Sequence, residues 1–376
     1  MRLRVVGLGE VGKRVAAAAR EAGHDVTEID RQDVVDRNVT HDATFVCVGT
    51  CAENGAFDAA AIERALSNVA AALAPGELIA IESTVPPRWT ATIAGPLIER
   101  ISGAAIGYDV FLVAAPARTD RTLAPQVRTI PKLVGGVTPA CTARGVEIYA
   151  QIVDRVIPVA DATIAEAAKL LENAFRYVNV AFTNEIAELF ATLGIEARSV
   201  VDAAATKPFG FMPFWPGVGI GGDCIPMAGS NLRELAQSAG VEDGILAAAL
   251  ASDATAPERT LRILQAMHGG RPSPLLIAGL TYKSMADSFA QSAGARLARH
   301  VAQAGLDVDV LEPHGDDQVT PLLGGARWVT RKTMRPRYEV AVIAAWQPEF
   351  RELVSEEIAD TIVDLSGPPP EEGKGS

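Results

Sequence analysis

The sequence predicts an α/β protein in which two doubly wound parallel-sheet domains are joined by a central helical domain with a long helix. Short Val/Ile/Leu-rich runs alternate with Ala-rich helical stretches over the first 160 residues, which is the pattern of βαβ units. Apolar residues then recur at helical spacing, without a helix breaker, from Ile164 to Leu193. A second alternating series follows Gly269-Gly270-Arg271-Pro272. We therefore expect domains at 1–160, 161–270 and 271–366, followed by a disordered Pro/Gly/Glu-rich tail at 367–376.

The elements are predicted in chain order. The first domain has strands at 2–6, 26–29, 44–48, 78–82 and 110–114, with helices at 12–22 and 58–73. Only 14 residues separate Asp30 from Phe45, too few for a complete βα unit, so we expect the sheet to be trimmed after its second strand. The long helix is followed by a Pro/Gly-dense stretch at 208–226 and by helix from 230 to 267, interrupted at Pro257. The last domain has strands at 275–280, 308–311 and 340–344 and a helix at 292–304.

Composition excludes several classes of function. The chain has 376 residues, and 34 basic against 46 acidic side chains give a net charge of −12, which disfavours binding to nucleic acid or to an anionic membrane. No apolar stretch reaches the roughly 20 residues of a membrane span, and we expect no signal peptide before the first strand. The four cysteines and five histidines have no metal-ligand spacing, so we expect no metal. A cytoplasmic enzyme is the natural expectation.

A glycine motif indicates a dinucleotide site. Gly7-Leu8-Gly9-Glu10-Val11-Gly12 follows the first strand and opens a helix, which is the context of a Rossmann phosphate-binding turn. Asp30 ends the second strand, where a carboxylate binds a ribose 2′-OH, so the motif favours NAD over NADP. Arg31, beside it, weakens this preference. The alternative is a βα turn that binds nothing.

A second glycine-rich segment precedes a cysteine. The stretch from Gly217 to Gly222 contains four glycines, which let a ligand approach the backbone closely. Helix resumes after it, so Cys224 is placed near a helix N-terminus, where a thiolate is stabilised. The alternative for a lone cysteine is a small buried apolar side chain.

The long predicted helix carries a candidate pair of polar groups. Lys169 and Asn173 are four residues apart and therefore share a helix face. A lysine beside an amide can polarise an alcohol or stabilise an oxyanion. The alternative is a solvated helix surface.

Six motifs in order resemble the nucleotide-sugar (UDP-glucose/GDP-mannose) dehydrogenase family. They are Gly7 to Gly12, Glu82-Ser83-Thr84-Val85-Pro86-Pro87, Lys169-Leu170-Leu171-Glu172-Asn173-Ala174-Phe175, Asn184-Glu185, the Gly217 to Cys224 loop and Gly279-Leu280-Thr281-Tyr282-Lys283. Gly135-Gly136-Val137 and Phe175-Arg176-Tyr177 look most like the branch that acts on UDP-N-acetylhexosamines.

The resemblance implies a Rossmann-like NAD domain, a helical dimerising middle, a Rossmann-like UDP-sugar domain and a homodimer. It also implies oxidation of a UDP-sugar C6 alcohol to a carboxylate by two NAD, through a thiohemiacetal and a thioester. The implied catalytic residues are Cys224, Lys169, Asn173 and Thr84. The implied cofactor residues are Gly7, Gly9, Glu10, Val11, Gly12, Asp30, Arg31, Val48, Gly49, Thr50, Ser83 and Thr84. The implied substrate residues are Arg118, Lys169, Asn173, Phe214, Gly217, Gly219, Gly221, Gly222 and Lys283.

The sequence departs from the family pattern at three charged positions. Ala117 replaces an acid implicated in thioester hydrolysis, Ala228 an acid after the cysteine, and Ala290 an arginine after the Lys283 motif. These losses leave two alternatives open. One is a divergent dehydrogenase for an unusual nucleotide-linked alcohol, which stops at the aldehyde. The other is an inactive NAD-binding paralogue.

Overall fold

We describe a computed structural model of the chain. It describes residues 1–31, 33, 36, 38–52, 55–118, 128–222, 224–281, 289, 291–315, 319–347, 349–350 and 358–366, with Cys224 described by its backbone. The chain forms two compact units, residues 1–172 and 173–376, and each is described by itself. The three-domain division expected from the sequence stays a prediction.

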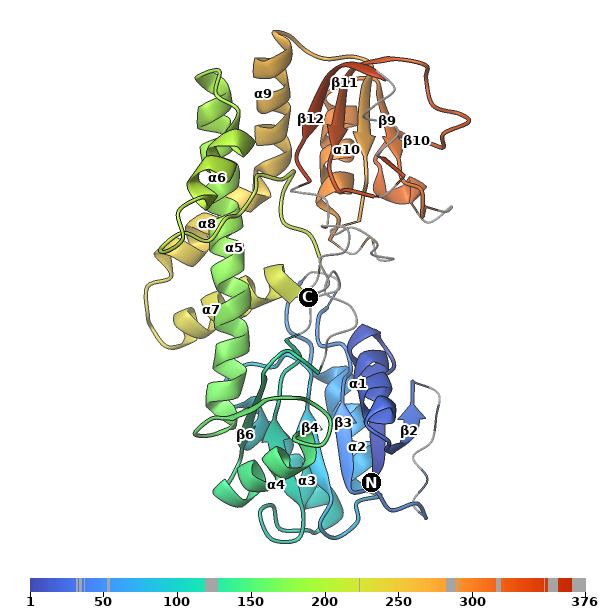
Figure 1. Cartoon of the computed structure of the whole chain (residues 1–376), viewed down its shortest axis with the longest axis vertical. Helices are drawn as coiled ribbons and strands as arrows, with labels where there is room; N and C mark the ends of the chain where they lie inside the picture. Colours follow the sequence, from blue (N-terminus) through green and yellow to red (C-terminus); the bar gives the residue numbers. More distant parts are fainter. Residues whose placement is uncertain are drawn as a thin grey trace. The chain divides into compact units, whose positions relative to one another are not determined.

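A seven-stranded sheet organises the described part of the N-terminal unit (Figure 1). Its order is β2-β1-β3-β4-β5-β6-β7, and all neighbours are parallel except β5 and β6, which are antiparallel. The strands are β1 (Arg2–Val6), β2 (Asp25–Ile29), β3 (Ala43–Val46), β4 (Leu78–Ile81), β5 (Phe111–Ala114), β6 (Lys132–Gly136) and β7 (Val156–Pro158). The helices are α1 (Glu10–Glu21), α2 (Ala60–Ala70), the π-helical turn η1 (Thr90–Ala94), α3 (Gly95–Ser102) and α4 (Pro139–Tyr149).

The strand order places a ligand crevice at one edge of this sheet. The chain leaves β1 for β2 on one side, and β3 pairs with β1 on the other side. In open α/β sheets, ligands bind at the carboxyl ends of the strands where the order reverses in this way. Strands β3 and β4 are buried along their whole length, as strands covered on both faces must be. The loops after β1, β3 and β4 are therefore fixed by the core and meet at this edge.

One helix of 31 residues, α5 (Ala162–Thr192), leads into the second unit. Four shorter helices follow it: α6 (Ala197–Ala205), α7 (Cys224–Ser238), α8 (Gly244–Ala254) and α9 (Ala256–His268). The interruption predicted at Pro257 lies two residues earlier, at Thr255, because this proline sits in the first turn of α9. A proline is tolerated there, since the first turn of a helix has no internal acceptor for its missing N–H.

A second, all-parallel sheet completes the described fold. Its order is β10-β9-β8-β11-β12. The chain adds β9 and β10 on one side of β8, and then β11 and β12 on the other side. The strands are β8 (Leu275–Ala278), β9 (Val308–Leu311), β10 (Arg327–Val329), β11 (Tyr338–Ile343) and β12 (Ala359–Asp364). The helix α10 (Ala293–Gln303) and the 3-10 turn η3 (Thr320–Leu322) accompany them. The predicted α/β fold class, with two Rossmann-like sheets and a helical segment between them in the chain, is confirmed.

Candidate active site

The first glycine motif forms a tight turn from β1 into α1. Gly7 has φ +90, and its N–H donates to Ile29 O at 2.8 Å. A Cβ at Gly12 would lie 1.8 Å from Gly7 O, so only glycine fits against the turn. A Cβ at Gly9, the N-cap of α1, would meet nothing within 4 Å, which leaves open space above the helix start. These residues therefore form a cradle that fits the phosphates of a dinucleotide.

The other predicted cofactor residues line the same edge of the sheet. Ser83 Oγ donates to Val48 O at 2.7 Å, and Thr50 Oγ1 donates to Thr84 O at 2.7 Å. The loop after β3, which includes Gly49, is thereby fixed to the loop after β4. The structure brings the two loops together from positions 34 and 35 residues apart in sequence.

The acidic residue expected at the ribose stands at the end of β2. Asp30 directly follows this strand, and its side chain and that of Arg31 are exposed. Glu10 and Val11 open α1, where Glu10 pairs with Arg14 at 3.4 Å. An exposed carboxylate at this position fits the 2′-OH of NAD. The cradle and the carboxylate together fit a bound NAD.

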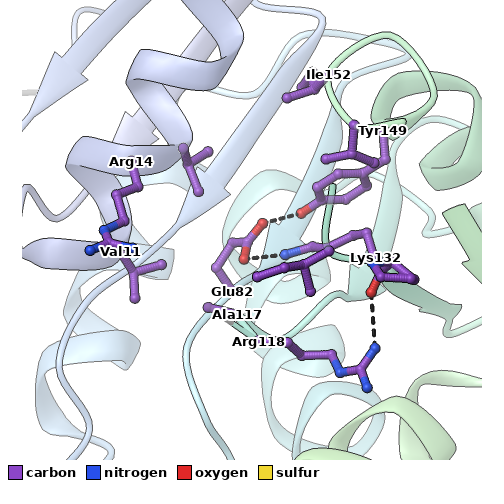
Figure 2. Close-up of a pocket in the computed structure, with 12 residues that line it drawn as sticks. Val11, Arg14, Glu82, Ala117, Arg118, Lys132, Tyr149 and Ile152 are labelled. Atoms are coloured by element: carbon purple, nitrogen blue, oxygen red, sulfur yellow. Dashed lines mark hydrogen bonds and ion pairs between the residues drawn. The ribbon is translucent and has the colours of Figure 1, made fainter. Parts of the chain in front are cut away.

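A buried carboxylate, that of Glu82, begins the loop that follows β4 (Figure 2). Glu82, at the end of β4, accepts a hydrogen bond from Tyr149 Oη at 2.5 Å and pairs with Lys132 Nζ. Lys132 Nζ also lies 5.0 Å from the centre of the Tyr149 ring. Burial, and then the charge of Glu82, raise the pKa of the Tyr149 hydroxyl and of the Cys47 thiol. Cys47 is buried, as its apolar surroundings in the sequence predict.

A small cavity connects this cluster to the cofactor cradle. It has a volume of about 30 Å³ and is lined by Val11 and Arg14 of α1 on one side and by Glu82 and Lys132 on the other (Figure 2). Ala117 also lines it, so the alanine at the family's acidic position lies beside the buried carboxylate of Glu82. A cavity of this volume is large enough for one water molecule.

Arg118, a predicted substrate residue, already has protein partners. Its guanidinium pairs with Glu172 at 2.6 Å and donates to Pro131 O at 2.9 Å. Arg118 also lines the small cavity. Its role toward substrate stays a prediction.

Glu166 fixes the loop that follows Thr84. Its carboxylate accepts the backbone N–H groups of Arg88, at 2.6 Å, and of Thr90, at 2.8 Å. Arg88 has φ +77, a conformation that L-residues rarely adopt. Burial raises the pKa of Glu166, although the hydrogen bonds from Thr90 and Arg88 oppose the shift. Glu166 therefore ties the loop of Thr84 to the helix that carries Lys169.

Lys169 and Asn173 lie one turn apart on α5, as predicted, and both are half-buried. Phe214, a predicted substrate residue, packs edge-on against Phe175 with 6.0 Å between ring centres. Both rings line an apolar cavity of about 500 Å³ between α5, α6 and the segment around Gly210. The side chain of Phe214 therefore lies in apolar surroundings.

The second glycine segment leads directly into α7. Gly217 N donates to Asn184 Oδ1 on α5 at 2.7 Å. Gly219, Gly221 and Gly222 continue the segment, and α7 begins at Cys224, six residues before the predicted start of the helix at 230. The prediction that Cys224 stands near a helix N-terminus is confirmed. The side chain of Cys224 lies outside the described residues, as do Lys283 and Ala290. Ala228, at the second altered position, is fully buried in α7.

Sequence reasoning missed the partners of Glu82 and the role of Glu166. Lys132 and Tyr149 follow Glu82 by 50 and 67 residues, and no local pattern connects them. Within the described part of the chain, no three His, Cys, Asp or Glu side chains gather as metal ligands. None of the helices described there is long and apolar enough to cross a bilayer.

Comparison with known proteins identifies the family. A profile of the "UDP-glucose/GDP-mannose dehydrogenase family, NAD binding domain" matches residues 32–153, and one of the family's central domain matches residues 163–255. Together they cover more than half of the chain. The UDP-N-acetyl-D-mannosamine dehydrogenase of Pyrococcus horikoshii is 27% identical, over 96% of this chain and 93% of its own. The UDP-N-acetyl-D-glucosamine 6-dehydrogenase of Pseudomonas aeruginosa is 31% identical, over 68% of this chain and 62% of its own.

Solved structures agree on the fold. The UDP-D-ManNAc dehydrogenase structure from Pyrococcus horikoshii has a TM-score of 0.81 at 24% identity and covers 100% of this chain and 97% of its own. A UDP-glucose dehydrogenase from Pyrobaculum islandicum has a TM-score of 0.79 at 22% identity, with coverage of 97% and 94%. The profile matches, including that of the family's NAD binding domain, confirm the predicted family and the NAD cofactor. The chain belongs to the UDP-glucose/GDP-mannose dehydrogenase family and is an NAD-dependent oxidoreductase that acts on CH–OH donors.

Proposed function

We propose that this protein oxidises the C6 alcohol of a UDP-hexose or UDP-N-acetylhexosamine to the uronic acid. One observation carries the proposal: the glycine segment from Gly217 to Gly222 leads into a helix whose first residue is Cys224, on a chain that also has a complete NAD cradle. Relatives named for UDP-N-acetylmannosamine and UDP-N-acetylglucosamine support the substrate class.

The first oxidation needs a group that stabilises negative charge on the alcohol oxygen as the proton leaves. NAD, when bound at the cradle, supplies the hydride acceptor for each of the two oxidations. Lys169 and Asn173 share one face of α5, and we assign them to the reacting oxygen, where an ammonium and an amide stabilise negative charge. Thr84 lies in the loop fixed by Glu166 and Thr50, beside the cofactor edge. This step converts the CH₂OH group to an aldehyde, with loss of a proton and a hydride.

The second oxidation uses Cys224. Its thiolate adds to the aldehyde carbon, and the aldehyde oxygen takes up a proton to give a thiohemiacetal. The thiohemiacetal then loses its hydroxyl proton and a hydride to give a thioester. Water then cleaves the thioester, which releases the carboxylate and returns the thiol. The helix N-terminus at Cys224 favours the thiolate that this addition requires. Arg118, Lys283, Phe214 and the glycine segment are assigned to the substrate on the family resemblance.

A second candidate is a dehydrogenase that stops at the aldehyde. Two structural observations favour it: Ala117 places a methyl group in the small cavity, and Ala228 is fully buried where the family has an acid. Ala117 removes the acid that the resemblance implicates in thioester hydrolysis. Ala228 removes the acid that the resemblance assigns to support of the oxyanion and of the Cys/Lys network, on which attack by the cysteine depends. An inactive NAD-binding paralogue is the third alternative.

The experiment is a panel of nucleotide sugars with NADH counted per sugar. Two NADH per sugar support oxidation to the acid, and one supports the aldehyde. Cys224→Ala should yield one NADH at most, whereas the control Cys51→Ala, a half-buried cysteine outside the proposed machinery, should behave as wild type. NAD binding without NADH formation from any nucleotide sugar would leave only the inactive alternative.

We further propose that the protein works as a homodimer. Six large apolar side chains on α5 and directly after it have 48–65% of their surface exposed: Ile164, Leu171, Phe175, Phe182 and Leu189 on the helix, and Leu193 just past its end. From Leu171 onward their spacing of four and seven places them on one side of the helix. Together with the cavity of about 500 Å³ beside them, they form an apolar surface that a second α5 would cover.

A further inference from the structure

The cysteine loop, defined here as Gly217–Gly222, is held by side chains from three separate helices of the second unit. Asn184 of α5 accepts the N–H of Gly217 at 2.7 Å. Asp253 of α8 accepts the N–H of Ile220 at 2.7 Å, and Arg296 of α10 donates to Ile220 O at 3.0 Å. The loop therefore has a fixed backbone despite its four glycines.

The two residues that hold Ile220 also hold each other. Arg296 Nη2 lies 3.1 Å from Asp253 Oδ2 and 3.3 Å from Oδ1. The carboxylate, the guanidinium and the backbone of Ile220 thus form a closed ring of hydrogen bonds, in which both polar backbone groups of one residue meet a charged partner. Bonds to charged groups are about twice as strong as neutral ones. This closed set of hydrogen bonds therefore holds the backbone of Ile220 in one position.

This ring of hydrogen bonds has buried surroundings. Asp253 is buried, and burial followed by its charge raises the pKa of the neighbouring Tyr177 hydroxyl. The Ile220 side chain is buried in a cluster with Tyr177. Gly219 has φ +131, a conformation that favours glycine, and a Cβ there would lie 2.9 Å from Arg296 Nη2, so a side chain at this position would crowd the guanidinium.

This ring acts on the start of α7 rather than on the fold in general. Ile220 lies four residues before Cys224, and a glycine-rich segment of that length is free to adopt many conformations unless it is bound. An ordinary structural ion pair would link two helices. Here Asp253 and Arg296 each also form a hydrogen bond with the backbone of Ile220 in the cysteine loop.

We propose that Asp253 and Arg296 are positioning residues that set the place of Cys224 by fixing Ile220. The inference rests on the proposed function of Cys224. Neither residue belongs to the six motifs of the family resemblance, and neither is assigned to substrate or cofactor. Their effect is on the geometry of the reacting thiol.

The test compares Arg296→Met and Asp253→Ala with Arg296→Lys and with the control Arg337→Met. Arg337 pairs with Asp360 at 2.8 Å in the same unit, on the exposed surface and without contact to the loop. A displacement of about 1 Å costs on the order of 10²-fold in rate, so we expect kcat to fall about that much in the first two variants. The KM for NAD should stay within about threefold, and Arg296→Lys should recover part of kcat.

A second readout does not depend on activity. Hydrogen exchange of the backbone amides at 217–222 should be at least about tenfold faster in Arg296→Met and Asp253→Ala than in wild type or Arg337→Met. Unchanged exchange in folded variants would overturn the inference, as would an equal loss of kcat in Arg337→Met. If the wild-type protein reduces no NAD with any nucleotide sugar, the proposed function fails while the exchange measurement still decides whether the pair fixes the loop.

Discussion

The buried pair of Glu82 and Lys132 gives the sharpest stability prediction. The side chain of Glu82 is fully buried and that of Lys132 is 11% exposed, and one carboxylate oxygen has Lys132 as its partner while the other has Tyr149. Lys132→Met removes the ammonium and leaves a carboxylate without its counter-charge in the core. Breaking a buried ion pair from one side costs about 3–5 kcal/mol of unfolding free energy. For a unit of this size, that corresponds to a fall in Tm of roughly 6–20 °C.

Thermal unfolding followed by circular dichroism measures this loss. NAD raises the midpoint of the unit that binds it, which identifies the transition of residues 1–172. The double variant Glu82→Leu/Lys132→Met should lose less than the sum of the single variants, because it buries no unpaired charge.

The control variant is Arg144→Met in the same unit. It breaks a pair with the exposed Glu147, which should cost less than about 1 kcal/mol. If Lys132→Met costs no more than this control, the carboxylate is hydrated or reoriented and the reasoning is refuted.

Three further perturbations follow from the described contacts. Gly12→Ala puts a Cβ 1.8 Å from Gly7 O, so calorimetry should show NAD affinity at least about 100-fold weaker; wild-type affinity would contradict the cradle. Burial opposes a low pKa for Asp309, but hydrogen bonds from a neighbouring arginine and tyrosine lower it below the usual 3.8. The stability that Asp309 provides is therefore complete above that value and lost as pH falls through the lower, folded-state pKa. Asp309→Asn should accordingly differ from wild type in urea denaturation at neutral pH and converge with it in acid, whereas a constant difference would contradict the assignment. Phe182→Asp should shift the protein from dimer to monomer in light scattering, while Tyr108→Asp, an isolated exposed ring, should not; a dimer unaffected by Phe182→Asp would contradict the α5 interface.

The fold could be predicted where an element has its own periodic signal. The strands Arg2–Val6 and Val308–Leu311 have the bounds that the sequence predicts, and the long helix Ala162–Thr192 differs by two residues at its start. The sequence prediction omits β6, β7, β10 and β12. Of these, β7, β10 and β12 lie at the edges of their sheets, whereas β6 lies inside its sheet between β5 and β7. Two of the omitted strands have only three residues, and such strands are ordered by the neighbouring backbone rather than by their own alternation.

The site residues also divide into those that a local sequence motif predicts and those that only the fold brings together. The glycine turn after β1 is a local motif, and its glycine–glycine contact at residues 7 and 12 follows from the spacing alone. The partners of Glu82 cannot be read locally, because they come from β6 and α4, on the far side of β5 in the sheet order. Asp253 and Arg296 are 43 residues apart on helices whose surface patterns give no sign of a shared partner. Charges that pair only because the fold buries them leave no signal in the sequence.

The altered charges are unevenly distributed over the two halves of the proposed reaction. The cradle, Lys169 and Asn173 are assigned to hydride removal and are all present, whereas Ala117 stands where the family resemblance places the acid of thioester hydrolysis. Ala228 stands where the resemblance places an acid that supports the oxyanion and the Cys/Lys network. We therefore expect thioester hydrolysis, rather than either oxidation, to limit turnover. Rapid mixing should show a burst of about two NADH per site and an acyl adduct on Cys224 in the intact mass, since an acyl-enzyme accumulates when its hydrolysis is slow. A single NADH without an adduct would place the stop at the aldehyde. A linear time course at two NADH per sugar would show that another group, such as the buried Glu82 beside Ala117, supplies the missing carboxylate.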